Sequence, residues 1–284
     1  MVAEAEAKVE TPLIRSRPAP RRRFCALVAS VGLLMLASPA TALAARAVLA
    51  AVPISRVDLP WWRARHEQKL AELHRGPVDL IFLGDSITQD WERRGPPAWA
   101  DFQPAWQHFY GDRHAVNLGF IGDTTASLLW RIDNGEVSGI SPKVAVVLIG
   151  ANNMGRPHWS AADTVTGINA IIAELRKRLP RTKILLLGVL PSERSAWITA
   201  TTAEINRMLA ATYGEQRVDD VTFLDLTSLF MKDDRLDRDM FLDPKQNPPG
   251  APLHPDAAAQ AKMAAAMEPT LAALMGDADH RRRQ

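Results

Sequence analysis

Ser86 stands directly after an apolar run, in the stretch IFLGDSIT of residues 81–88. A strand that ends in glycine, aspartate and serine presents the hydroxyl at the start of the next element. A serine in that position can act as a nucleophile when a base removes its proton. The same position suits an ordinary helix N-cap, because a serine side chain accepts hydrogen bonds from the first N–H groups of a helix. Ser86 is therefore a candidate nucleophile or a cap.

Gly122 and Asn152 are candidate donors to a negatively charged oxygen. Gly122 lies in the turn NLGFIGD of residues 117–123, and Asn152 follows the apolar run that ends at residue 150. A backbone N–H and a side-chain NH₂ that are fixed in advance can stabilise the oxyanion of a tetrahedral intermediate. Both residue types are also common in turns that have no chemical role.

His254 is the candidate general base. It lies in the stretch APLHPD of residues 251–256, just before the last helical pattern. A histidine placed after the last strand can return to a nucleophile at the sheet edge and take its proton. A lone histidine is otherwise an ordinary surface or satisfied side chain.

Apolar runs predict the strands that must position these side chains, at residues 78–84, 114–120, 143–150, 183–189 and 221–226. Helical periodicity appears around them, at residues 61–73, 124–135, 160–179, 196–214 and 255–275. Because the strands are apolar throughout, we expect a parallel sheet that is buried on both faces. We therefore predict an α/β fold, a three-layer αβα sandwich with a five-stranded parallel sheet of flavodoxin-like order.

This strand order brings the candidate residues together. In flavodoxin-like order, the carboxyl ends of the first three strands lie side by side, near the topological switch point of the sheet. Ser86, Gly122 and Asn152 each follow one of these ends. A hydroxyl, a glycine turn and a carboxamide at one edge suit acyl transfer.

The motifs GDSIT, NLGFIGDTT, GANN and LHP occur in this order along the chain. They resemble the four blocks of the GDSL/SGNH hydrolases. The segments between them are similar to the branch that contains the catalytic subunits of platelet-activating-factor acetylhydrolase IB and their bacterial relatives. The resemblance implies the SGNH hydrolase fold, with Ser86 as nucleophile and His254 as base. It also implies an oxyanion hole formed by the backbone N–H of Ser86, Gly122 and the side chain of Asn152.

Two positions depart from the family pattern. Ile121 fills the place of the second glycine in the usual G-x-G-G-D turn, which would narrow the acyl pocket or shift the loop. Ala251 stands where the orienting acid of the family precedes the histidine. We identify Asp243 as that acid, with residues 244–251 as an insertion, because a loop that leaves and returns costs little closure entropy. Asp256, or a Ser-His dyad without an acid, is the alternative.

Composition narrows the classes of function. The net charge is only +2 over 284 residues, with much of the positive charge at the two ends, so nothing indicates a nucleic-acid partner. The single cysteine, Cys25, lies in the N-terminal segment, which excludes cysteine catalysis and Cys-ligated metals in the body. The histidines lack metal-ligand spacing, and no nucleotide-binding motif is present. We therefore expect neither a metal nor a cofactor.

Residues 1–44 indicate a targeting segment. A basic stretch precedes an apolar run, and Ala42 and Ala44 form an A-x-A cleavage pattern. An uncleaved membrane anchor is the alternative, because the apolar run is nearly long enough to span a bilayer. Either way, we expect a periplasmic or secreted protein. The expected organisation is a linker at residues 45–60, a hydrolase domain at 61–276 and a basic tail at 277–284.

The residues and the resemblance together predict a serine esterase that hydrolyses short-chain acyl esters, acetyl esters above all, through Ser86, His254 and Asp243. The expected partner is a small acyl ester of a carbohydrate or a lipid. Contact with a membrane is expected only through the N-terminal segment, if it stays uncleaved. The alternatives are a polysaccharide O-acetyltransferase that uses the same serine, and a degenerate domain that binds glycan or protein.

Overall fold

The central sheet contains parallel strands in the order β2-β1-β3-β4-β5, which confirms the predicted flavodoxin-like arrangement. The computed structural model describes residues 47–214 and 220–277. The strands of the sheet are Leu80–Gly84 (β1), Ala115–Gly119 (β2), Val144–Leu148 (β3), Lys183–Leu187 (β4) and Val221–Leu224 (β5). Their apolar residues are buried almost throughout, as expected for a sheet with both faces covered.

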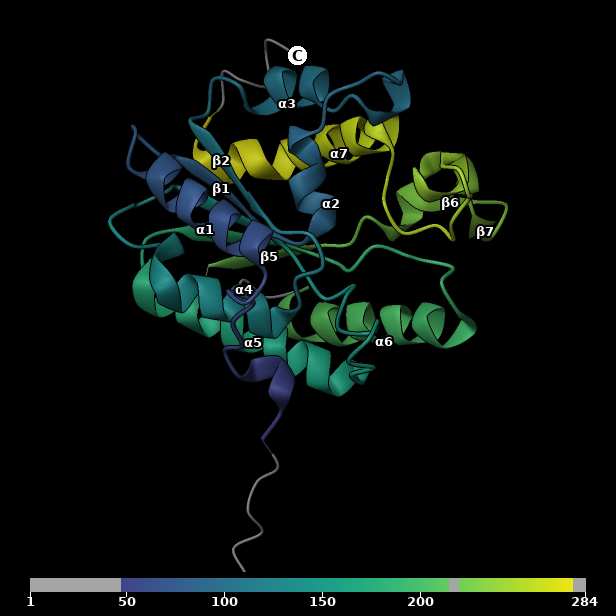
Figure 1. Ribbon diagram of the computed structural model, residues 1–284, viewed down its shortest axis with the longest axis horizontal. Helices are drawn as coiled ribbons and strands as arrows, with labels where there is room; N and C mark the ends of the chain where they lie inside the picture. The colour runs from purple at the N-terminus through teal and green to yellow at the C-terminus, as the bar shows by residue number, and fades with distance from the viewer. Residues whose placement is uncertain (1–46, 215–219, 278–284) are drawn as a thin grey trace, which may run out of the picture. The chain divides into compact units, whose positions relative to one another are not determined.

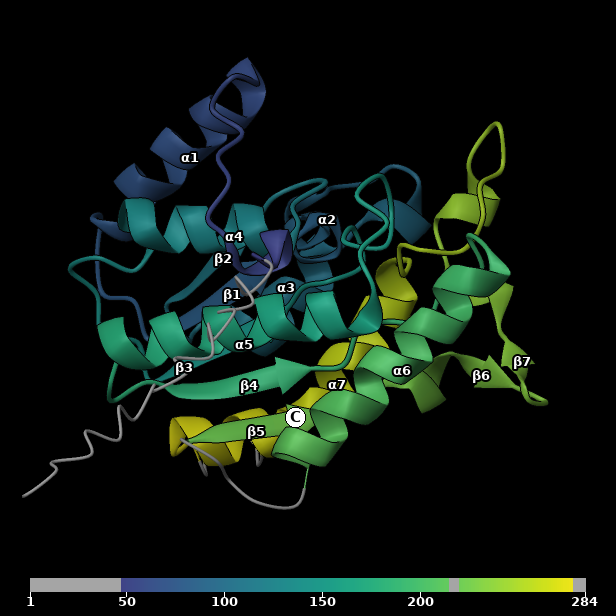
Figure 2. The ribbon, with the colours of Figure 1, turned by 90° about the horizontal axis from the view of Figure 1, so that it is seen from below.

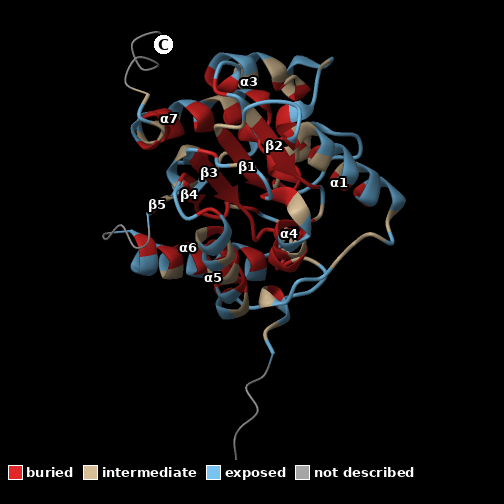
Figure 3. Ribbon diagram, turned by 90° about the vertical axis from the view of Figure 1, so that its left-hand side faces the viewer, coloured by how far each residue is buried: buried red, intermediate tan, exposed pale blue. Residues whose placement is uncertain are grey.

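Helices cover both faces of this sheet (Figure 1). α3 and α7 lie on one face, and α4, α5 and α6 lie on the other. The helices are Pro60–Leu73 (α1), Ser86–Gln89 (α2), Gln103–Tyr110 (α3), Thr125–Arg131 (α4), Ala161–Arg178 (α5), Ala196–Tyr213 (α6) and Ala257–Met275 (α7). Each face has its own cluster of buried apolar side chains, and the strands between them are buried (Figure 3). The arrangement is the predicted three-layer αβα sandwich.

Side-chain caps fix where the longer helices begin. Thr124, Ser160, Ser195 and Asp256 each accept a hydrogen bond from a backbone N–H in the first turn of α4, α5, α6 and α7. Such caps satisfy N–H groups that have no partner inside the helix. The caps at α4 and α7 lie next to candidate site residues, so they also hold the ends of the site loops.

Shorter elements were not predicted from the sequence. The 3₁₀ turns are Leu49–Ala51 (η1), Asp90–Glu92 (η2), Ala98–Ala100 (η3), Thr227–Phe230 (η5), Arg238–Met240 (η6) and Asp243–Lys245 (η7), and Ile132–Glu136 (η4) is a π-helical turn. α3 also lies in a stretch to which the sequence analysis assigned no helix. Met231–Lys232 (β6) and Arg235–Leu236 (β7) form a small antiparallel hairpin outside the central sheet (Figure 2).

The described part of the interval 45–60, expected as a linker, packs against the sandwich. Ala50 is buried, and its carbonyl oxygen accepts a hydrogen bond from Thr125 Oγ1 at 2.8 Å. Ile54 N–H donates to the carbonyl oxygen of Ala126 at 3.1 Å. These contacts tie the segment to the start of α4, next to the glycine turn of the candidate site.

The predicted targeting segment lies outside the described residues, as does all but the first residue of the predicted basic tail. Among the helices that the structure describes, none combines the length and the apolar character needed to cross a membrane.

Candidate active site

Ser86 is the first residue of α2, at the carboxyl end of β1. The Asp85 side chain caps this short helix by accepting a hydrogen bond from Ile87 N–H at 3.0 Å. Gly84 lets α2 begin close to the sheet, because a Cβ at that position would overlap the Thr88 side chain of α2. Asp85 therefore provides the cap, and the Ser86 hydroxyl is free to contact another group.

That group is the imidazole of His254. Ser86 Oγ lies 2.9 Å from His254 Nε2, although the two residues are far apart in the sequence. On the other side of the ring, His254 Nδ1 lies 2.8 Å from Asp243 Oδ1. Hydroxyl, imidazole and carboxylate thus form one continuous chain of hydrogen bonds, the arrangement that activates a serine nucleophile.

Asp243 also holds the backbone around the histidine. Its Oδ2 accepts hydrogen bonds from Leu253 N–H at 2.8 Å and from His254 N–H at 2.7 Å. One carboxylate therefore fixes both the main chain and the ring of His254. Because these bonds fix Oδ2, the other oxygen of the carboxylate, Oδ1, is held facing His254 Nδ1.

The insertion leaves the site and returns through a short antiparallel contact. Phe241 and Pro255 form a β-bridge, and Leu242 N–H donates to the carbonyl oxygen of His254 at 2.8 Å. Gly250 N–H closes the loop by donating to the carbonyl oxygen of Asp243 at 2.7 Å. The bridge pairs the segment before the insertion with the segment after it, which brings Asp243 beside His254.

Asp256 is committed elsewhere. Its Oδ1 accepts a hydrogen bond from Ala259 N–H at 2.7 Å, as the cap of α7. Its Oδ2 pairs with Lys245 Nζ at 2.5 Å. Both oxygens of Asp256 therefore have other partners, whereas Asp243 contacts the imidazole.

The electrostatics of the site favour a protonated histidine beside an ionised acid. Burial lowers the pKa of His254, but the hydrogen bond and charge of Asp243, with the charges of Asp90 and Asp85, outweigh this and leave the pKa above its ordinary value. Burial raises the pKa of Asp243, but the hydrogen bonds from His254 outweigh this and leave the pKa below its ordinary value. The pair is thus arranged to stabilise an imidazolium, the species that forms when the serine loses its proton.

Asp85 is a buried carboxyl next to Ser86. Burial raises its pKa to about 7, against the hydrogen bond from Ile87 and the charge of His254. Its Oδ2 lies 3.4 Å from Asn152 Nδ2. The contacts of Asp85 are those of a residue that braces the start of α2, where Ser86 lies, and the amide of Asn152.

Asn152 and Gly122 lie on the wall of one cavity of about 710 Å³. Asn152 Nδ2 donates to the carbonyl oxygen of Asp123 at 3.0 Å, which orients the amide. Gly122 has a φ of +75°, a conformation that favours glycine, and its N–H donates to no other group in the described part of the chain. The Gly122 N–H is therefore available to an oxygen that enters from this cavity, and the Asn152 amide lies on the same wall.

Ile121, the departure from the family turn, points its side chain outward. The side chain is 49% exposed. Its N–H donates to Gln89 Oε1 at 2.9 Å, and its carbonyl oxygen accepts from Arg56 at 2.8 Å. The isoleucine is thus accommodated at the surface, and its backbone is held from both sides.

Asp123 anchors the glycine turn from inside the protein. Its carboxylate accepts hydrogen bonds from three side chains. Oδ1 accepts from Trp62 Nε1 and from Arg56 Nη1, each at 2.7 Å, and Oδ2 accepts from Arg131 Nε at 2.8 Å. Because Asp123 follows Gly122 directly, these bonds fix the turn that carries the proposed donor.

Arg131 is the residue of this site that sequence reasoning missed. It is fully buried in α4 and forms ion pairs with Asp123 and Glu136. It also donates to the carbonyl oxygens of Gly84 at 3.0 Å and Leu118 at 3.1 Å, at the ends of β1 and β2. The signal in the sequence was an arginine within the apolar stretch SLLWRI.

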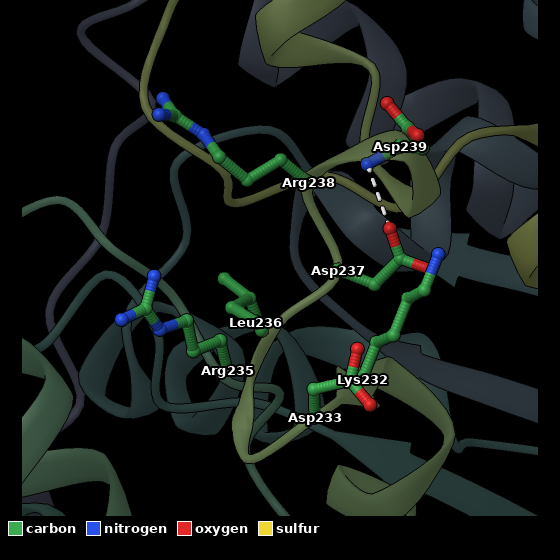
Figure 4. Close-up of a pocket in the computed structure, with 7 residues that line it drawn as sticks. All are labelled: Lys232, Asp233, Arg235, Leu236, Asp237, Arg238 and Asp239. Atoms are coloured by element: carbon green, nitrogen blue, oxygen red, sulfur yellow. Dashed lines mark hydrogen bonds between the residues drawn. The ribbon is translucent and has the colours of Figure 1, made fainter.

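Another hollow of the described chain lies away from the candidate catalytic residues. The hollow beside the β6–β7 hairpin, of about 510 Å³, is lined by side chains such as Arg235, Asp237 and Asp239 and contains none of the residues discussed above (Figure 4). In the part of the chain that the structure describes, no group of three or more His, Cys, Asp or Glu side chains is arranged to hold a metal ion.

Comparison with known proteins identifies the class of protein that this fold and site define. The family model described as GDSL-like lipase/acylhydrolase matches residues 82–262. The rat protein named platelet-activating factor acetylhydrolase IB subunit alpha2 is 32% identical over 190 residues, which cover 65% of this chain and 76% of that protein. The chain therefore belongs to the GDSL-like lipase/acylhydrolase family, and it is an ester hydrolase.

Solved structures agree in fold. A GDSL-like lipase from Bacteroides thetaiotaomicron superposes with a TM-score of 0.53 at 16% identity and covers 73% of this chain and 96% of its own. A carbohydrate esterase family 3 protein from Talaromyces cellulolyticus gives a TM-score of 0.53 at 17% identity and covers 71% and 100%. These similarities confirm the predicted SGNH hydrolase fold.

Proposed function

We propose that the protein is a serine esterase that cleaves short acyl esters through an acyl-enzyme, with Ser86 as nucleophile, His254 as base and Asp243 as orienting acid. The observation that carries this proposal is the hydrogen-bond chain from Ser86 Oγ through the imidazole to Asp243, with contacts of 2.9 and 2.8 Å.

The reaction follows from the positions of the atoms. His254 Nε2 takes the proton of the Ser86 hydroxyl as its oxygen attacks the ester carbonyl carbon. Asp243 holds the ring in the tautomer with a proton on Nδ1 and stabilises the imidazolium. The imidazolium then gives its proton to the leaving alcohol as the ester C–O bond breaks. The same nitrogen then takes a proton from a water molecule as the water oxygen attacks the acyl carbon. The bond from this carbon to Ser86 Oγ breaks, the imidazolium returns its proton to Oγ, and the acid leaves.

The oxyanion of each tetrahedral intermediate would be bound by the backbone N–H groups of Ser86 and Gly122 and by the side chain of Asn152. Donors that are fixed before the reaction do not have to reorganise as charge develops, so each is worth a few kcal/mol, about 3 kcal/mol by comparison with a serine protease. Asp123 and Asp85 supply this rigidity, because they hold the turn and the amide.

The acyl group and the alcohol are proposed from the relatives. The rat relative is named as an acetylhydrolase and the fungal neighbour as a carbohydrate esterase. We therefore propose an acetyl or similarly short acyl group on a carbohydrate or lipid alcohol. The basic and apolar pattern of residues 1–44 supports a periplasmic or secreted location.

The test measures initial rates of hydrolysis of p-nitrophenyl acetate, butyrate and octanoate by the full chain. We expect acetate to be preferred and Ser86→Ala to lower kcat by about 10⁴–10⁶-fold. Ser228→Ala, at an exposed serine in η5, is the matched control and keeps full activity. A fluorophosphonate labels the wild type but not Ser86→Ala. Hydrolysis that survives Ser86→Ala, or transfer of the acyl group to a glycan in place of water, would contradict the proposal.

A further inference from the structure

The cavity that contains Gly122 and Asn152 is also rich in arginine. Arg56, Arg156 and Arg194 lie on its wall, and Asp58 is the acidic side chain among the residues that line it. Its volume of about 710 Å³ is far larger than an acetyl group needs and lies within the range of pockets that hold a small ligand. A substrate whose carbonyl oxygen reaches Gly122 and Asn152 therefore has room to place another group among these arginines.

Arg194 is a partly buried cation without a carboxylate partner. Its Nη2 donates to the carbonyl oxygen of Ala151 at 2.7 Å and its Nε to Ser192 Oγ at 3.1 Å. Among residues 47–214 and 220–277, no carboxylate forms an ion pair with it. Burial lowers the pKa of Arg194, and the more distant charges of Asp85 and Asp243 offset this only in part. A half-buried guanidinium of this kind is suited to bind an anion.

Arg156 adds a second unpaired charge. It is exposed, lies on the loop that follows Asn152, and forms no ion pair with any described residue. Arg56 differs from both, because Asp123 neutralises it at 2.7 Å and its guanidinium lies over the Trp61 ring at 5.4 Å. The cations available to a ligand are therefore Arg156 and Arg194, opposed by the exposed Asp58.

The position of these arginines relates them to the reaction. Arg194 bonds to the carbonyl oxygen of Ala151, the residue directly before Asn152, and Arg156 follows Asn152 by a few residues. Both therefore border the proposed oxyanion donor. A substrate that reaches Asn152 therefore also comes within reach of these arginines.

We infer that Arg194 and Arg156 bind a negatively charged group, a carboxylate or a phosphate, on the ester substrate. The inference rests on the proposed esterase function and specifies its substrate class. The planar guanidinium of Arg194 faces such a group with donors that its bonds to Ala151 and Ser192 have already oriented. Binding energy at this group would place the ester carbonyl between the oxyanion donors.

The test compares pairs of esters with and without one negative charge. One pair carries the charge on the acyl group and the other carries it on the alcohol. The acyl-side pair is p-nitrophenyl hydrogen glutarate and its methyl ester. The alcohol-side pair is p-acetoxybenzoate and its methyl ester. The readout is the ratio of kcat/KM for the anionic ester to kcat/KM for its neutral partner. We expect this ratio to exceed one in at least one pair, which identifies the side of the substrate that carries the charge, and to fall as salt is added.

Variants locate the effect. Arg194→Gln lowers the ratio by about tenfold, the size of one lost hydrogen bond to a charged group, and Arg194→Lys lowers it less because the charge remains. Arg156→Gln, at an exposed position, lowers it by a few-fold. Arg181→Gln removes an exposed arginine before β4, at the opposite end of the strand from the site, and leaves the ratio unchanged.

The outcomes separate this inference from the proposed function. If the wild type hydrolyses neutral esters through Ser86 but shows no preference for either anionic ester, the inference is wrong and the esterase proposal stands. A ratio that is unchanged in Arg194→Gln and Arg156→Gln also overturns it. Should Arg194→Gln fail to fold, inhibition of the wild type by free glutarate or benzoate, weakened in Arg156→Gln, supplies the same evidence. If no hydrolysis depends on Ser86, the esterase proposal itself fails.

Discussion

At the scale of single residues, Asp243 shows how a site can keep its geometry while its sequence spacing changes. It stands eleven residues before His254, yet its carboxylate contacts both the ring and the backbone N–H of that histidine. Asp256 is nearer in sequence but points away, because it caps α7 and pairs with Lys245. Spatial contact, rather than separation along the chain, selects the partner of the imidazole.

Asp243→Asn is expected to lower kcat/KM by about 10⁴-fold, because the ring loses the acid that holds its tautomer. Asp243 also raises the pKa of His254 above 6.5, and the neutral ring is the active base. The rate of the wild type should therefore rise with pH through a midpoint above the ordinary pKa of histidine. The variant keeps the burial and the charges of Asp90 and Asp85 but loses the hydrogen bond and charge of Asp243, so its midpoint should move to lower pH. The measurement is a pH profile of kcat/KM.

Asp256→Asn is the matched control for this prediction. Asparagine still caps α7 through its side-chain oxygen, so we expect activity within a few-fold of the wild type, about threefold at most. If Asp256→Asn lowered the rate as much as Asp243→Asn, the proposed role of Asp243 would be wrong. An unchanged pH midpoint in Asp243→Asn would also contradict it.

The two asparagines of the GANN stretch are expected to behave differently. Asn152→Ala removes a proposed oxyanion donor and should lower kcat by about 10²–10³-fold with little change in KM. Asn153 is fully buried and bonds instead to Thr125, accepting from its N–H at 3.0 Å and donating to its Oγ1 at 2.8 Å. Asn153→Ala should therefore lower the free energy of unfolding by about 1–3 kcal/mol.

Steady-state kinetics and urea unfolding of both asparagine variants distinguish these roles. A large loss of stability in Asn152→Ala with kcat preserved would reverse the assignment. Equal effects of the two changes on kcat would show that the amide of Asn152 has no special place in the reaction.

At the scale of elements, α4 is bonded to the ends of β1 and β2, the two strands that lead to Ser86 and to the glycine turn. The buried guanidinium of Arg131 donates to backbone oxygens at the ends of β1 and β2 and pairs with Asp123. The Arg131 guanidinium also lies over the Phe120 ring, 4.0 Å from its centroid. The helix thus holds the strand ends in the register that the site requires.

Arg131→Met is expected to lower the free energy of unfolding by about 3–5 kcal/mol, because it leaves the buried carboxylates of Asp123 and Glu136 without their cation. Urea unfolding followed by circular dichroism measures this. Arg178→Met is the control, since Arg178 pairs with Glu174 and Asp133 at the surface, where such pairs contribute about 0–1 kcal/mol. Similar losses in the two variants would mean that burial of the Arg131 network does not determine its contribution.

At the scale of the molecule, the segment before α1 contributes to the sandwich. Its contacts run from Ala50 and Ile54, which bond to the start of α4, to Arg56, which bonds to Ile121 and Asp123. This segment therefore supports the glycine turn and also forms part of the wall of the arginine-lined cavity.

Deleting residues 47–59 from the full chain is expected to lower the free energy of unfolding by about 2–5 kcal/mol, since several hydrogen bonds of about 0.5–1.5 kcal/mol are lost together. The turn that carries Gly122 also loses its outer support, so kcat should fall. Arg56→Gln removes only the arginine contacts and should show a smaller loss of stability. An unfolding curve that is the same with and without residues 47–59 would refute this prediction.

The fold could be predicted because its signals are local. Each apolar run was long enough to indicate a strand buried on both faces, and each helical stretch carried its own periodicity. α3 was missed because it has only eight residues, Gln103–Tyr110, fewer than the window over which helical periodicity can be recognised. The interval 45–60 was expected to be a linker because nothing in its composition indicates the surface that it covers.

The sequence by itself determined where the strands of the sheet lie along the chain and which residues, Ser86, Gly122, Asn152 and His254, follow them, since hydrophobic periodicity and short motifs depend on neighbouring residues. Only the tertiary structure decided which acid meets the histidine, how the buried Arg131 binds the ends of β1 and β2, and that arginines from three distant segments line one cavity. These features depend on contacts between residues far apart in the chain. No local pattern encodes such distances, because they arise only when the sheet, its helices and the returning loop pack together.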